Sequence, residues 1–305
     1  MTMVSDTIRL GTRASPLAMA QAHMVEAALV AAHPGLTVEI MPVVASGDRI
    51  LDRALADVGG KALWTKELDV SLRAGDIDIA VHSMKDVETL RPPELSIAAM
   101  LPRADVRDRL IGCTSVALLP DGARVGTSAP RRTAQLLRLR PDLKITLFRG
   151  NVATRLAKLD AGEADATLLA AAGLDRLGLG DIGSAVDIDT MLPAPSQGAV
   201  GIETLTYRST VRALVDAIGD RNTYDCVVAE RSLLAALSAD CRSPVAALAV
   251  REGDMIWLRA EIYSVDGAQS EQGEARFAIG DVASAAALGA AMLARAATSV
   301  RAAFG

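Results

Sequence analysis

A short pattern that occurs twice in the 305-residue sequence limits the folds open to the chain. The first copy is RLGTRASP at residues 9–16, and the second is RVGTSAP at residues 124–130. Each copy predicts a strand, a Gly-Thr pair and a helix that starts at proline, because proline suits the first helical position. Two later segments, AGDIDI at 74–79 and AGEADA at 161–166, repeat in the same order. This order predicts two similar α/β domains that face one another, and ligands commonly bind at such interfaces.

The last third of the chain has a different pattern. Two prolines in LPAPSQGAVGIE, at 192–203, predict a linker, and its end predicts a strand that returns to the first domain. A helix near 222–238, strand candidates at 245–250, 256–262 and 274–279, and a helix from about 283 follow. This succession is typical of an α+β domain. The predicted domains are residues 1–101 with 198–218, residues 104–194, and residues 220–305.

Composition and charge exclude several classes of protein. The formal net charge of −5 disfavours a non-specific nucleic-acid binder. Cys113, Cys226 and Cys241 are widely spaced and odd in number, which supports neither a disulfide framework nor a zinc site. The opening MTMVSDTIRLG lacks the basic and apolar regions of a signal peptide, and no apolar run reaches the length of a membrane span. We therefore expect a cytoplasmic protein.

The segment IDIAVHSMKD, at 77–86, carries the first candidate site. An apolar run that predicts a strand ends in His82, Ser83, Lys85 and Asp86. In open α/β folds, ligands bind outside the carboxyl ends of strands. Lys85 can hold an anion, while Asp86 can move a proton or stabilise a developing cation. The ordinary interpretation of the same residues is a solvated strand end with a neighbouring ion pair.

Basic residues concentrate in one segment, 131–158, which contains eight lysines and arginines against Asp142 alone. Arg131 and Arg132 fall in the first turn of a predicted helix, where an anion would bind and a cation is otherwise disfavoured. For each arginine considered alone, the simpler interpretation is a solvent-exposed surface residue. Together they predict a polycarboxylate or polyphosphate ligand, although no P-loop or GxGxxG motif is present. The other candidates at strand ends and helix starts are Arg13, Thr127, Ser128, Arg149, Asn151, Arg155 and Arg176.

Cys241 is the cysteine whose neighbours favour reactivity. It falls in a predicted loop between a helix and a strand, next to Arg242, and a neighbouring cation favours the thiolate. The simpler interpretation is an inert small residue.

Long motifs spread over essentially the whole chain resemble the hydroxymethylbilane synthase family, also called porphobilinogen deaminase. They match in order and in spacing, which makes the resemblance highly specific. The motifs are TRASPLAMAQAH, VGGKALWTKEL, DIAVHSMKDV, VGTSAPRR, LFRGNVATRLAKLDAGEADA, AAGLDRLGL and LPAPSQGAVGIE.

The resemblance implies a transferase of tetrapyrrole biosynthesis, on the route to heme and chlorophyll. The family joins four porphobilinogen molecules head to tail, releases four ammonia molecules and frees linear hydroxymethylbilane by hydrolysis. Its primer is a dipyrromethane cofactor, which the resemblance attaches to Cys241 by a thioether, and Asp86 becomes the catalytic carboxylate. The implied fold is α/β: two periplasmic-binding-protein-like domains facing a cleft, with a smaller C-terminal α+β domain, in a monomer.

Matching positions also imply binding roles, because each pyrrole ring carries an acetate and a propionate that cations can hold. The implied cofactor-binding residues are Ser83, Lys85, Asp86, Thr127, Ser128, Arg131, Arg132, Gln197 and Gly198. The implied substrate-binding residues are Arg13, Ser15, Lys61 on a lid loop, Arg149, Asn151, Arg155 and Arg176.

Three positions depart from the family pattern. Ala129 stands where a second serine is expected, Asp240 where a glycine is expected, and Trp64 where phenylalanine is usual. Two other classes share parts of the pattern: a non-enzymatic anion-binding protein of the periplasmic type, and an effector-sensing regulator. The C-terminal domain with Cys241 counts against the first, and the lack of a preceding helix-turn-helix segment counts against the second.

Overall fold

The computed structural model describes residues 7–43 and 65–304, and these fall into two compact units. Among these residues, unit 1 comprises 7–43, 65–104 and 198–224, and unit 2 comprises 105–197 and 225–304. The predicted lid loop with Lys61 lies outside the described residues, as does Trp64.

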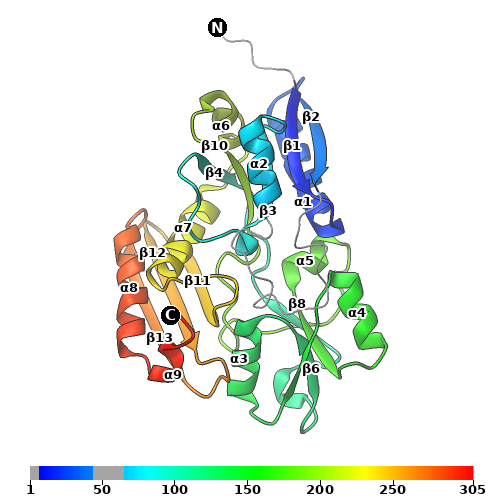
Figure 1. Cartoon of the computed structure of the whole chain (residues 1–305), viewed down its shortest axis with the longest axis vertical. Coiled ribbons are helices and arrows are strands. Elements are labelled where there is room, and N and C mark those ends of the chain that lie inside the picture. Colours follow the sequence, from blue (N-terminus) through cyan, green and yellow to red (C-terminus); the bar gives the residue numbers. More distant parts are fainter. Residues whose placement is uncertain (1–6, 44–64, 305) are drawn as a thin grey trace. The chain divides into compact units, whose positions relative to one another are not determined.

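Unit 1 is built on a five-stranded mixed sheet with the strand order β2-β1-β3-β10-β4 (Figure 1). β1 runs parallel to β2 and β3, whereas β10 runs antiparallel to both of its neighbours. Val25 and Leu29 of α1 are fully buried in one cluster with Leu10 and Ile79 of the strands. The elements of this unit are β1 (Thr7–Arg13), α1 (Pro16–Ala32), β2 (Thr37–Val43), α2 (Lys66–Ala74), β3 (Ile79–Ser83), η2 (Met84–Asp86), β4 (Leu95–Met100), β10 (Val200–Leu205) and α6 (Ser209–Asp216).

The first sheet of unit 2 has the same design. Its order is β7-β6-β8-β5-β9, with β6 parallel to β7 and β8 and with β5 antiparallel to β8 and β9. The antiparallel strand comes early in this sheet and late in the first, because the chain leaves unit 1 after β4 and returns to it as β10. The elements are β5 (Asp108–Ile111), η3 (Val116–Leu118), β6 (Arg124–Thr127), α3 (Pro130–Leu139), β7 (Lys144–Leu147), α4 (Val152–Asp160), β8 (Ala166–Ala170), α5 (Ala171–Arg176) and β9 (Ser184–Ala185).

The repeated sequence pattern makes the same contact in both sheets. Arg9 N donates to Asp78 Oδ2 at 2.9 Å, and Asp78 N donates to Arg9 O at 2.8 Å. Arg124 N donates to Asp165 Oδ2 at 2.7 Å, and Asp165 N donates to Arg124 O at 2.8 Å. Both pairs add a side-chain ion pair. The repeat is therefore structural as well as sequential, which confirms the prediction of two similar α/β folds.

Gly126 in the repeated Gly-Thr pair is needed for packing. A Cβ at this position would lie 2.4 Å from Cδ2 of Phe148, whose side chain is fully buried. We expect Gly126→Ala to lower the free energy of unfolding by about 1–3 kcal/mol, because a packed ring cannot move away cheaply. Urea unfolding followed by circular dichroism measures the change. Gly180→Ala is the control, since its Cβ would lie 3.1 Å from Asp175 Oδ1 at the end of a movable side chain; equal stability of the two variants would contradict the prediction.

The C-terminal part of unit 2 has its own core. The antiparallel sheet β11-β12-β13 packs with α7, α8 and α9 in a cluster that contains no residue before Cys226 (Figure 1). This separate core supports the proposal of three domains. The boundaries of the three domains, and the cleft between the first two, stay predictions. The elements are α7 (Arg221–Ala236), β11 (Val245–Glu252), β12 (Met255–Tyr263), β13 (Ser270–Ala278), α8 (Val282–Arg295) and α9 (Thr298–Arg301).

Most predicted elements are present, with shifted ends. The first strand continues through the Gly-Thr pair to Arg13, whereas the repeat predicts that the pair follows the strand. β3 starts at Ile79, two residues later than predicted. Pro16 is the first residue of α1, as predicted, and Ser15 caps this helix. No helix within the described ranges combines the length and the apolar character that crossing a membrane requires.

Candidate functional site

The carboxyl end of β3 borders a cavity of about 50 Å³ within unit 1. β3 ends at Ser83 and continues directly into η2, so the strand end brings Asp86 to the cavity. Arg13, at the end of β1, and Ser15, at the start of α1, also reach this cavity, although they lie far from Asp86 in the sequence. The cavity lining includes Arg13, Ser15, Gln21, His82, Ser83 and Asp86. Four of the predicted site residues therefore share one cavity.

Asp86 is half-buried, and its carboxylate accepts no hydrogen bond from any residue that the structure describes. Lys85, its neighbour in η2, is also half-buried. Ser83 is held by Gln21, whose Nε2 donates to Ser83 Oγ at 2.8 Å. The site thus combines a fixed hydroxyl group with a carboxylate that can still take a partner.

A second group of predicted residues meets in unit 2 around one buried carboxylate, Asp108. Arg131 Nη2 donates to Asp108 Oδ2 at 2.8 Å, and Arg132 Nη2 donates to Asp108 Oδ1 at 2.7 Å. Gln197 Nε2 donates to the same Oδ1 at 2.9 Å. Burial would raise the pKa of Asp108, but Arg131 and Arg132 hold it well below its usual range.

Asp108 changes the expectation for Arg131 and Arg132. The sequence predicts two guanidinium groups at a helix start that only a ligand compensates, whereas the structure gives both an internal carboxylate partner. Each nevertheless keeps one buried N–H group, Nε, that finds no acceptor among the described residues. A buried donor without an acceptor is costly, so these groups indicate an anionic ligand.

Arg149 is the clearest candidate for anion binding. It follows β7 and is 8% exposed, and its Nη1 has no hydrogen-bond partner in the described part of the chain. No described carboxylate forms an ion pair with Arg149 either. Since buried cations are normally paired, this arrangement indicates an anionic ligand.

Ser128 and Arg155 lie together beside this region. Arg155 Nη2 donates to Ser128 Oγ at 3.3 Å, and Arg155 Nε donates to Gly150 O at 3.0 Å. The Asn151 side chain caps α4 by accepting a hydrogen bond from Thr154 N at 2.9 Å. Arg155 therefore points back to the start of its helix.

Ala129, where a serine is expected, does not offer its backbone N–H in place of the lost hydroxyl group. That N–H already donates to Thr127 Oγ1 at 3.2 Å. Thr127 is buried, and its hydrogen bond with Ala129 stabilises the turn between β6 and α3. The Thr127 hydroxyl group still has its own O–H to donate to a ligand, whereas a ligand contact by the Ala129 N–H competes with this bond.

The segment before β10 has an unusual backbone. Ser196 has a φ of 65° and Gly198 a φ of 86°. A Cβ at Gly198 would lie 2.6 Å from Ala104 O, so only glycine fits where the outgoing and returning segments run together. The buried carboxylate of Glu230 accepts from Ser196 N at 2.6 Å.

Cys241 is exposed in the turn between α7 and β11. Its neighbours neutralise one another, because Arg242 Nη2 lies 2.6 Å from Asp240 Oδ2. Arg176 ends α5, and burial lowers the pKa of its guanidinium. Lys61 lies outside the described residues.

Sequence reasoning missed Asp108 and Gln21. Asp108 is a single acid between two arginines in RDR, a pattern that suggests a surface ion pair. Gln21 lies on α1 and reads as an ordinary helix residue. In the described residues, no group of three or more His, Cys, Asp or Glu side chains could hold a metal ion.

Two family models match the chain. One, described as porphobilinogen deaminase, dipyromethane cofactor binding domain, matches residues 8–213, and the other, described as porphobilinogen deaminase, C-terminal domain, matches residues 224–297. The chain is 58% identical to porphobilinogen deaminase from Sphingopyxis alaskensis over 305 residues, covering 97% of this chain and 96% of that protein. It is 49% identical to porphobilinogen deaminase from Acidithiobacillus ferrooxidans, covering 88% and 89%. The solved methionine binding protein MetQ is 16% identical, with a TM-score of 0.43, covering 72% of this chain and 92% of MetQ.

Proposed function

This chain belongs to the porphobilinogen deaminase family, and we propose which of its residues bind the cofactor, bind the substrate and catalyse the reaction. The enzyme, also called hydroxymethylbilane synthase, is a transferase that joins four porphobilinogen molecules on a dipyrromethane cofactor and releases ammonia. When bound, the cofactor supplies the pyrrole α-carbon to which the first substrate is added.

We propose that Cys241 holds the cofactor by a thioether, because it is an exposed cysteine in a turn. The buried Nε groups of Arg131 and Arg132 fit the cofactor's acetate and propionate groups. Hydroxyl, amine, carboxylate, amide and backbone groups complete the proposed site. The further cofactor-binding residues are Ser83, Lys85, Asp86, Thr127, Ser128, Gln197 and Gly198.

Asp86 is the catalytic residue in this proposal. As ammonia leaves the substrate, positive charge develops on its pyrrole ring, and a carboxylate beside the pyrrole N–H stabilises that charge. The same carboxylate can take up the α-proton once the new carbon–carbon bond has formed. The support is the position of Asp86 at the cavity and the absence of a competing hydrogen bond among the described residues.

Carboxylates of incoming substrate would meet a second set of side chains, in which Arg149 is the best-supported member. It is a buried guanidinium with no carboxylate partner in the described ranges, which a substrate acetate or propionate would supply. The other substrate-binding residues that we propose are Arg13, Ser15, Lys61, Asn151, Arg155 and Arg176.

We expect Arg149→Gln to raise the KM for porphobilinogen about 10-fold or more without lowering thermal stability. A charge-assisted hydrogen bond contributes about 1.5–3 kcal/mol to binding, and removing an unpaired buried cation does not weaken the fold. Initial rates at varied porphobilinogen and a thermal melt of the same sample measure both effects. Arg124→Gln is the matched control: it breaks the exposed ion pair with Asp165, which should lower the free energy of unfolding by about 1 kcal/mol or less and leave the KM unchanged. An unchanged KM with a lower melting temperature for Arg149→Gln would reject the role.

We also propose a monomeric cytoplasmic enzyme with neither nucleic acid nor membrane as a partner. The formal charge of −5 supports the first exclusion, since nucleic-acid binding needs excess positive charge. Sedimentation at several concentrations tests the monomer.

A further inference from the structure

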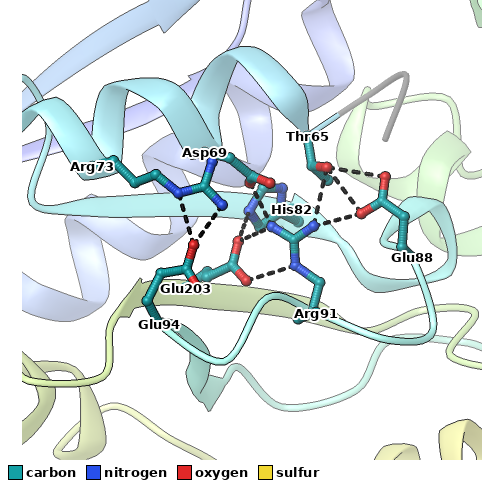
Figure 2. A network of polar contacts seen from close by, with 8 residues as sticks. All are labelled: Thr65, Asp69, Arg73, His82, Glu88, Arg91, Glu94 and Glu203. Atoms are coloured by element: carbon teal, nitrogen blue, oxygen red, sulfur yellow. Dashed lines mark hydrogen bonds and ion pairs between the residues drawn. The ribbon is translucent and has the colours of Figure 1, made fainter. Parts of the chain in front are cut away.

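Arg91 lies at the centre of a buried polar network in unit 1 that the proposed roles do not use (Figure 2). It follows η2 in the loop that leads to β4, and only 9% of its side chain is exposed. Its guanidinium makes five hydrogen bonds to described residues, which engages every N–H donor that an arginine has. A cation so fully committed is a structural anchor rather than a ligand-binding group.

The acceptors come from three parts of the chain. Arg91 Nε and Nη2 each lie 2.8 Å from an oxygen of Glu203 on β10, a bidentate pair. Nη2 also donates to Asp69 Oδ1 of α2 at 2.5 Å. Nη1 donates to Glu88 Oε2 at 2.6 Å and to Thr65 Oγ1 at 3.2 Å. One side chain therefore ties α2 and the loop after Asp86 to the central sheet.

The network depends on the charge of Arg91, because three carboxylates surround it. Burial would raise the pKa of Glu203, but hydrogen bonds from His82 and Arg91 lower it to about 2. Burial raises the pKa of Asp69, and Arg91 opposes that shift. Without the guanidinium, buried carboxylates would lose their counter-charge and would have to take up protons or move apart.

The same network holds both ends of the segment that carries Asp86. Glu203 Oε2 lies 3.1 Å from His82 Nε2 and 2.8 Å from Arg91 Nη2. One fully buried carboxylate thus holds a residue before Asp86 and a residue after it. Glu88, two residues beyond Asp86, is tied a second time by Thr65 Oγ1 at 3.0 Å. The segment 82–91 is fixed at both ends and in its second half.

We propose that Arg91 is the positioning residue for Asp86, holding segment 82–91 so that the Asp86 carboxylate stays at the cavity. Arg91 does not touch the substrate; it acts through Glu203, His82 and Glu88. The proposal rests on the catalytic role proposed for Asp86.

The test is Arg91→Met, which keeps the length and apolar stem of the side chain and removes its charge. We expect kcat to fall about 10- to 100-fold while the KM for porphobilinogen changes less than about 3-fold, because a small displacement of a catalytic group slows chemistry more than binding. The intact mass should still include the cofactor. Arg91→Lys should give an intermediate kcat, since an ammonium group keeps the charge but cannot form the bidentate pair.

Arg73→Met is the matched control. Arg73 lies on α2 beside the network and pairs with Glu94, but both side chains are about two-fifths exposed (Figure 2). Loss of this surface pair should leave both kcat and KM unchanged.

The outcomes separate the two proposals. Wild-type kcat in folded Arg91→Met would overturn the positioning role, as would an equal loss in Arg73→Met. If Arg91→Met does not fold, Arg91→Lys decides: a wild-type kcat overturns the proposal, and a reduced kcat at unchanged KM supports it. Asp86→Asn is measured in the same series. Retained turnover there overturns the role of Asp86 and the positioning proposal with it, whereas lost turnover beside a normal Arg91→Met overturns only the latter.

Discussion

A Cys241→Ala variant should carry no cofactor and should convert no porphobilinogen above background. Cys241 is exposed, whereas Cys113 is half-buried and Cys226 is buried in the C-terminal core. A thioether to a two-ring primer requires a thiol that the primer can reach. The mass of the wild-type protein should exceed that of the chain by two linked pyrrole units, and the variant should show the mass of the chain alone.

Turnover and mass should disappear together in this variant, because growth of the product starts on the attached primer. The control is Cys113→Ala, which removes another thiol from unit 2 and should keep both the added mass and the wild-type rate. A thermal melt shows whether each variant is folded. Full activity in Cys241→Ala, or an unmodified mass for active wild-type protein, would reject the attachment site.

The repeated elements could be predicted from the sequence because local rules determine them. Ser15 and Pro16 start a helix, and glycines at 75 and 162 adopt positive φ where the chain leaves a helix. The paired Arg-Asp contacts involve the same repeat, since similar motifs place an arginine and an aspartate at neighbouring strands of each sheet, 69 residues apart in the first and 41 in the second. These features involve residues that the pattern itself brings together.

The networks could not be predicted, because each depends on the crossover of the chain between the two sheets. Asp108 contacts Arg131 only because β5 pairs with β8, although these two strands are far apart in the sequence. Arg91 meets Glu203 only because β10 returns next to β3, which joins residues 112 positions apart. Charged residues of this kind resemble surface residues until the topology is known. Sequence patterns therefore located the candidate site but not the groups that hold it in place.

An Asp86→Asn variant should fold and carry its cofactor, yet lose turnover about 10²-fold or more. The substitution keeps the shape of the side chain and removes the charge that stabilises the developing cation and accepts the proton. Stability should be unchanged, because the carboxylate accepts no hydrogen bond from a described residue and lines a cavity. The measurements are product formation under saturating porphobilinogen, a thermal melt and the intact mass.

Asp76→Asn is the control for the Asp86 variant, since Asp76 is an exposed aspartate of the same unit near the start of β3 and should tolerate the change. Asp86→Glu adds a further distinction. It keeps the carboxylate but moves it by one methylene, so a rate between those of Asp86→Asn and the wild type indicates that both charge and position matter. A near-wild-type rate for Asp86→Asn with the cofactor in place would refute the catalytic role, whereas a low rate with the cofactor missing would assign Asp86 to cofactor assembly instead.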